Sequence, residues 1–178
     1  MQGGMLARWG GLLMALAGAC LAPPGTPARA DEPGLQFVFE EWVSLGAAAS
    51  PGATAMGGRN LIPITGGHFS GPGADGKGIS GTVVPGGWDW QLRRADGCTH
   101  IHADYMLKTG DGALINIVND GVSCRARDPM AVVRTHPVFE APLGRYDWLS
   151  QGAFVGTLDP GTLPDGSRAV HIRIYKVT

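Results

Sequence analysis

The chain has 178 residues, a length typical of one domain, and its 14 basic and 15 acidic side chains give a formal net charge of −1. Its 29 glycines and 13 prolines exceed average usage, but 44% of its residues are hydrophobic, which argues against a disordered chain. The basic residues are scattered and form no patch, which argues against nucleic-acid binding.

Residues 1–30 have the order of parts found in a secretory signal peptide. Arg8 supplies positive charge, Leu12 to Leu21 form a short apolar run, and Ala28-Arg29-Ala30 fits a small-x-small cleavage site. The run is too short to remain as a bilayer-spanning anchor, so no stable membrane span is expected after cleavage. The sequence therefore predicts a mature domain over residues 31–178 that is periplasmic or secreted.

Three cysteines bear on this prediction. Lipid attachment at Cys20 is an alternative to simple cleavage, and an uncleaved tether is another. Cleavage removes Cys20 and leaves Cys98 and Cys124, and an even cysteine count in an oxidising compartment favours a disulfide.

Strand signals dominate the chain after residue 31. Leu35, Phe37 and Phe39 recur with a period of two. Glycine-rich turns are expected at residues 85–87, 95–97 and 110–112, and loops at residues 46–58 and 71–78. The expected later strands cover residues 79–84, 88–93, 99–108, 113–119, 132–139, 153–157 and 170–177, with one helical turn near 146–151. Strands spaced about ten residues apart predict a sandwich or barrel.

The hairpin around Gly110-Asp111-Gly112 allows its register to be predicted. If these residues form a three-residue loop, Tyr105 faces Ile117 and Ala103 faces Asn119 on an apolar, inward face. The same register places Cys98 opposite Cys124, within reach of a disulfide.

Several blocks in order along residues 35–178 resemble one protein family. They include Gly58-Arg59-x-x-Ile62-Pro63-Ile64-Thr65-Gly66-Gly67, Gly81-Thr82-Val83-Val84-Pro85-Gly86-Gly87-x-Asp89-Trp90-Gln91, Asp111-Gly112-Ala113-Leu114-Ile115 and Arg145-Tyr146-x-Trp148-Leu149. The chain is similar to the bacterial domain of unknown function 3237. The resemblance implies a single small antiparallel β-barrel with no assigned activity. His68, His102 and Asp104 depart from the family's usual residues at those positions.

The candidate ligand-binding residues are polar or aromatic side chains expected at the barrel interior or its end: Tyr105, Asn119, Arg145, Tyr146 and Trp148. Tyrosine supplies a proton donor, arginine binds an anion and tryptophan offers a stacking surface. We expect them to line one cavity with Arg145 at its rim. The alternative is that the Arg145 cluster is an aromatic plug, with Arg145 paired to a carboxylate.

Other polar groups allow two interpretations each. His100, His102 and Asp104 share one strand face and have residue types that bind Zn²⁺, but the predicted register puts them on the solvated face, so no metal site is predicted. Asp89 serves as a general base if desolvated, or as a cap for turn N–H groups. Arg59 and Arg134 allow two interpretations: each binds an anion, or each forms an ion pair with a glutamate at position 40, 41 or 140.

The sequence predicts an exported barrel that binds a small, mostly apolar ligand. The alternative function is a cofactor-free isomerase, cyclase or lyase that uses tyrosine and arginine side chains. A third possibility is an inert, filled barrel that serves as an envelope interaction protein. No cofactor is predicted, and the sequence leaves the oligomeric state open.

Overall fold

The structure, a computed structural model, describes residues 32–178, so the signal-peptide and Cys20 predictions lie outside the described residues. Within this range the chain forms nine strands and one short helix. They are β1 (Leu35–Leu45), β2 (Ala49–Thr54), β3 (Gly57–Gly71), β4 (Ile79–Arg93), β5 (Thr99–Thr109), β6 (Leu114–Ser123), β7 (Val133–Glu140), α1 (Trp148–Gln151), β8 (Phe154–Thr162) and β9 (Arg168–Val177).

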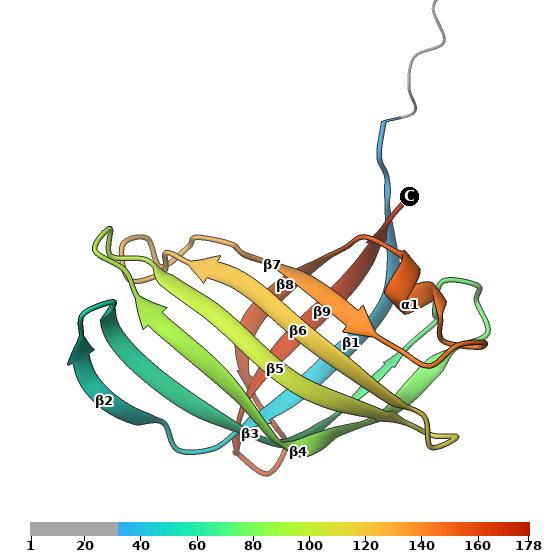
Figure 1. Ribbon diagram of the computed structural model, residues 1–178, viewed down its shortest axis with the longest axis horizontal. Helices are drawn as coiled ribbons and strands as arrows, with labels where there is room; N and C mark the ends of the chain where they lie inside the picture. The colour runs from blue at the N-terminus through green and yellow to red at the C-terminus, as the bar shows by residue number, and fades with distance from the viewer. Residues whose placement is uncertain (1–31) are drawn as a thin grey trace, which may run out of the picture. The chain divides into compact units, whose positions relative to one another are not determined.

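The strands close into an antiparallel barrel (Figure 1). The sheet runs β1-β9-β8-β7-β6-β5-β4-β3, and the pairing of β1 with β3 joins its two edges. β2 pairs with β3 outside this closed set of eight strands. Closure satisfies the backbone groups that an open sheet would leave at its edges. The prediction of an all-β barrel is confirmed.

The β5–β6 hairpin has the predicted register. Tyr105 pairs with Ile117, Ala103 pairs with Asn119, and these side chains are buried. The disulfide between Cys98 and Cys124 continues the same pairing beyond the ends of both strands. Alternation of buried and solvated side chains fixes this register, because a slip by one residue would reverse the faces.

Two sequence predictions for other segments were wrong. Residues 85–87 make no turn: β4 runs through them, and its register against β5 shifts between Val84 and Trp88. Proline and glycine are tolerated at such a bulge, where ladder hydrogen bonds are already interrupted. Residues 46–58, expected to be a loop, contain β2, which is exposed along its whole length and therefore carries no hydrophobic pattern.

The barrel has two unlike ends. At one end lie the 72–78 loop, the 110–113 turn and the β7–β8 connection with α1, which lies at the end of the barrel in Figure 1. Trp148 packs against Phe154 there, with ring centroids 6.0 Å apart, and Phe154 packs against Phe139 at 5.0 Å. We call this the plugged end. At the opposite end β4 finishes and β5 begins, and we call it the mouth end.

Two features are absent from the part of the chain that the structure describes. No helix among residues 32–178 is long and apolar enough to cross a membrane. The same residues contain no cluster of three or more histidine, cysteine or acidic side chains arranged to hold a metal ion.

Candidate functional site

The barrel interior contains a carboxyl group that is completely buried. Glu41 is 0% exposed, and its Oε2 accepts a hydrogen bond from the Tyr105 hydroxyl at 2.8 Å. Its Oε1 has no hydrogen-bond partner among the described residues. Burial raises the pKa of Glu41 to about 7, although the bond from Tyr105 opposes the shift. A carboxyl with this pKa can change its protonation state near neutral pH.

The tyrosine in this pair remains protonated. Burial first, and then the charge of Glu41, raise the pKa of Tyr105 well above its ordinary value. The hydroxyl of Tyr105 is consequently a neutral donor whose direction depends on Glu41. When Glu41 is ionised, Tyr105 donates to it; when Glu41 is protonated, its own O–H can donate to the tyrosine oxygen.

Asp89 is a second buried carboxyl, on the inward face of β4. Its Oδ2 accepts a hydrogen bond from Gln91 Nε2 at 2.7 Å, while Oδ1 is buried without a partner in the described chain. Burial raises the pKa of Asp89, and the bond from Gln91 opposes the shift. A desolvated carboxylate with one free oxygen is the form that suits a general base.

Asp89 and Tyr105 line a small chamber of about 60 Å³, whereas Glu41 contacts Tyr105 and does not itself line the chamber. Asp89, Gln91, Tyr105 and Asn119 supply its polar atoms, and its remaining wall is aliphatic. The Oδ1 atom of Asn119 is buried without a partner, like that of Asp89. Two free acceptors in an apolar chamber fit a ligand that brings hydrogen-bond donors, such as a hydroxyl group.

The chamber adjoins a wider depression of about 330 Å³ at the mouth end. Five residues line both: Leu45, Gln91, Ile101, Leu158 and Val170. The chamber is too small for more than about two water molecules, since each occupies roughly 30 Å³ in the liquid. The chamber therefore has room only for a small group, whereas the adjoining depression has room for a larger one.

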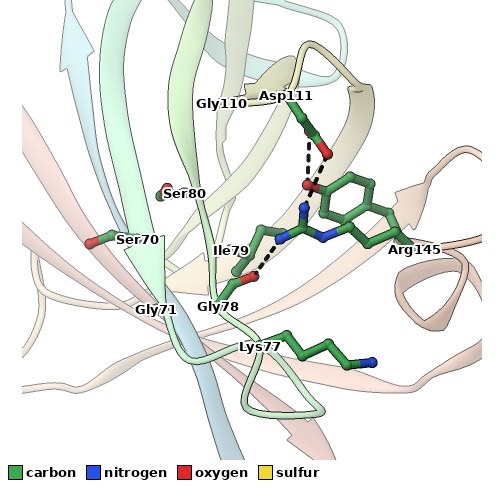
Figure 2. A pocket seen from close by; sticks show the side chains of 10 residues that line it. Ser70, Gly71, Lys77, Gly78, Ile79, Ser80, Gly110, Asp111 and Arg145 are labelled. Carbon is green, nitrogen blue, oxygen red and sulfur yellow. Dashed lines mark hydrogen bonds and ion pairs between the residues drawn. The ribbon is translucent and has the colours of Figure 1, made fainter.

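A separate hollow of about 370 Å³ lies at the plugged end (Figure 2). Arg145 Nη1 contacts Asp111 Oδ2 at 3.2 Å, and the Tyr146 hydroxyl donates to Asp111 Oδ1 at 2.9 Å. Hydrogen bonds from Thr109 and then Tyr146 lower the pKa of Asp111. Arg145 also donates to the Gly78 carbonyl, at 3.5 Å. These contacts tie the β7–β8 connection to two neighbouring loops.

The structure divides the five predicted ligand-binding residues between these places. Tyr105 and Asn119 lie together at the chamber. Arg145 and Tyr146 line the hollow at the other end, and Trp148 packs against Phe154. The expectation of a single shared cavity was wrong, because pairing within the β5–β6 hairpin says nothing about where the β7–β8 connection folds. The pairing of Arg145 with a carboxylate matches the plug alternative.

Two residues of the chamber region were not selected from the sequence. The sequence pattern offers Glu41 only as an ion-pair partner for arginine, and Asp89 as either a general base or a cap. Extending the alternation from Phe39 to Val43 would have placed Glu41 inward, because all three are fully buried. The same alternation fails before Phe39, where the pairing with β9 shifts and Val38 is buried as well.

The histidines considered for a metal lie on the outer face. His100 Nε2 and His102 Nδ1 both approach Asp120 Oδ1, at 3.2 and 2.8 Å. Asp104 instead accepts a hydrogen bond from Asn116 at 2.9 Å. The three residues named from the sequence therefore do not converge on one point. Within residues 32–178, Arg59 and Arg134 have no glutamate partner: Arg59 contacts the Met56 sulfur, and Arg134 donates to the Val133 carbonyl.

Comparison with known proteins gives relatives for the whole barrel. A UPF0311 protein of Rhodopseudomonas palustris is 33% identical over 135 residues, which are 68% of this chain and 85% of that protein. The crystal structure of a protein of unknown function from the same species superimposes with a TM-score of 0.71 at 30% identity, covering 84% of this chain and all of the other. A β-barrel-like protein of Acinetobacter baumannii gives a TM-score of 0.68 at 28% identity, covering 85% of this chain and 99% of that one.

One relative is described as an enzyme. The hydroalkoxylation enzyme phnH of Penicillium herquei is 29% identical over 139 residues, which are 78% of this chain and 83% of that protein. A crystal structure of an enzyme from the same fungus has a TM-score of 0.62 at 25% identity and covers 86% of this chain and all of the other. The family model of the proteins of unknown function DUF3237 matches residues 33–177, and this chain therefore belongs to the DUF3237 family.

Proposed function

We propose that this protein is an exported, cofactor-free enzyme that moves a proton within a small, mostly apolar substrate bearing a hydroxyl group. The observation that carries the proposal is Asp89, a buried carboxyl in the wall of an apolar chamber that it shares with Tyr105, with one oxygen that has no hydrogen-bond partner among the described residues. Folding alone gains nothing from such a group, since burying a carboxyl without full hydrogen bonding is costly. Export is supported by the order of residues 1–30 and by the disulfide.

The proposed reaction is the addition of the substrate's hydroxyl group across its own carbon–carbon double bond. Asp89 Oδ1 takes the hydroxyl proton while the substrate oxygen bonds to one alkene carbon. The alkene's electron pair takes a proton from the Tyr105 hydroxyl, and Glu41 in its acid form replaces that proton. The product is a cyclic isomer of the substrate, and the proton on Asp89 then returns to Glu41, which restores the starting state.

Three observations support this class of reaction. Glu41 has a pKa of about 7, so it can be an acid in one step and recover its proton afterwards. The chamber is largely apolar, which strengthens charge interactions with the reacting atoms. The Penicillium relative is named for hydroalkoxylation, which is the addition of a hydroxyl group to a multiple bond.

The test uses 2-allylphenol, whose cyclisation to a dihydrobenzofuran creates a stereocentre. We expect the wild-type protein to give one enantiomer in excess, measured by chiral chromatography. Asp89→Asn should lower the rate at least about 100-fold, the usual contribution of a general base. Asp104→Asn is the matched control, because this carboxylate is exposed on the outer face, and it should leave the rate unchanged.

The main competing function is a binding module without turnover. Titration of the protein with 2-allylphenol, followed by NMR, separates the two functions. Binding that shifts the resonances of Ile101 and Ala103 without product formation would favour the binding module. Product formed equally by wild type and Asp89→Asn would contradict the role of Asp89.

A further inference from the structure

The depression at the mouth end is lined by two arginines and by no acidic side chain. These arginines are Arg125 and Arg168. Its other lining residues are apolar or neutral, among them Ile62, Val133 and Pro160. The charge of the arginines is opposite in sign to that of the chain as a whole, which carries a formal net charge of −1.

The two arginines are held differently. Arg125 Nη2 contacts Asp159 Oδ1 at 2.6 Å, and its Nε donates to the Ala131 carbonyl at 3.1 Å. These bonds fix its guanidinium at the rim. Arg168 begins β9, is exposed, and forms no ion pair within residues 32–178. Arg168 therefore keeps its guanidinium available for an anion from outside.

A line of side-chain amides leads from this depression to the chamber. Asn60 Nδ2 donates to Gln91 Oε1 at 3.3 Å, and Gln91 Nε2 donates to Asp89 Oδ2 at 2.7 Å. Asn60 and Gln91 line the depression, while Gln91 and Asp89 line the chamber. A ligand that reaches from the arginines to Asp89 passes along this line and against the aliphatic side chains that both hollows share.

We propose that the substrate carries a carboxylate, which Arg168 binds at the mouth while the substrate's hydroxyl group reaches Asp89. Arg125 lies at the same rim, but its charge is balanced by Asp159, so Arg168 is the group that binds the carboxylate. The substrate class is thus a small hydroxy acid with an apolar body between its two polar ends. This inference rests on the proposed function, because it assumes that the chamber receives the reacting end.

The test compares two ligands that differ only in charge, 3-allyl-4-hydroxybenzoate and 3-allyl-4-hydroxybenzamide. We expect the wild-type protein to bind the acid about tenfold more tightly than the amide, since hydrogen bonds to an ionised group are about twice as strong as neutral ones. Isothermal titration gives both dissociation constants. Raising the salt concentration should weaken binding of the acid and leave binding of the amide unchanged.

Variants then test whether the preference for the acid over the amide depends on Arg168. Arg168→Gln should remove the tenfold preference, and Arg168→Lys should retain most of it. Lys77→Gln is the control, because it removes one positive charge from the loop at the plugged end, and it should keep the whole preference. Thermal unfolding of each variant confirms that it is folded.

The outcomes separate this inference from the proposed function. Equal binding of acid and amide by the wild-type protein, with turnover that depends on Asp89, would overturn the carboxylate inference and leave the proposed function standing. A preference for the acid that survives in Arg168→Gln would also overturn it. If neither ligand binds, both proposals are contradicted.

Discussion

The hydrogen bond between Tyr105 and Glu41 affects both the stability of the fold and the proposed proton transfer. Both groups are buried, and the tyrosine hydroxyl is the only recorded partner of the carboxyl within residues 32–178. Tyr105→Phe removes that donor with little change in volume. We expect unfolding free energy to fall by about 1–3 kcal/mol, because the carboxyl is left without a hydrogen bond.

Urea unfolding at pH 8 measures this change. Glu41 is mostly ionised at this pH, so the loss of unfolding free energy is greatest there. Tyr175→Phe is the control, since that ring packs on Phe37 at the barrel exterior and should cost little. Unchanged stability would show that the bond between Tyr105 and Glu41 is absent. A loss of stability with unchanged affinity for 2-allylphenol would leave Tyr105 as a purely structural residue.

Among the elements, the β5–β6 hairpin was the most predictable from sequence. Its turn is local, its alternation is regular, and the Cys98–Cys124 pair falls on the same register. β4 was less predictable, because Pro85, Gly86 and Gly87 have the composition of a turn. Here they form a bulge, which both flanking strands stabilise from positions far away in the sequence. A carbon placed on Gly87 would lie 2.4 Å from Tyr105 Cβ, so close strand packing excludes a side chain there.

The disulfide at the end of the β5–β6 hairpin leads to a prediction about stability. Its cysteines are 26 residues apart, and a loop of that length gives on the order of 3 kcal/mol in the chain-entropy treatment. Replacing both cysteines with alanine should lower unfolding free energy by about this amount. Thiol titration of the denatured, unreduced chain from Asp31 onwards should detect no free thiol; detection of two would contradict the bridge.

At the scale of the whole molecule, barrel closure decides which predicted residues meet. Tyr105 and Asn119 come from paired strands, so the sequence placed them together correctly. Glu41 contacts Tyr105 from 64 positions away in the sequence, because β1 and β5 face each other across the interior. Arg145 is separated from both residues, because the β7–β8 connection that carries it lies at the plugged end. Neither relation follows from local pattern, since both depend on how eight strands close.

Barrel closure also buries the Glu41 carboxyl completely, which favours its acid form. Glu41 has a pKa of about 7 in the folded chain against its ordinary value of 4.5. The folded state therefore holds its proton more tightly than the unfolded state does. This contribution to stability is complete below about pH 4.5, declines as pH rises and is lost above about pH 7.

The most direct measurement is the unfolding free energy from pH 5 to pH 8, compared between wild type and Glu41→Gln. Glutamine has no proton to lose, so the difference between the two proteins isolates Glu41, and Glu140→Gln serves as an exposed control on β7. We predict that wild type loses about 2–3 kcal/mol relative to Glu41→Gln over this range, since most of the effect of the raised pKa falls between these two pH values. Parallel curves for the two proteins would contradict the account, because Glu41 would then be ionised throughout and unable to supply a proton to Tyr105.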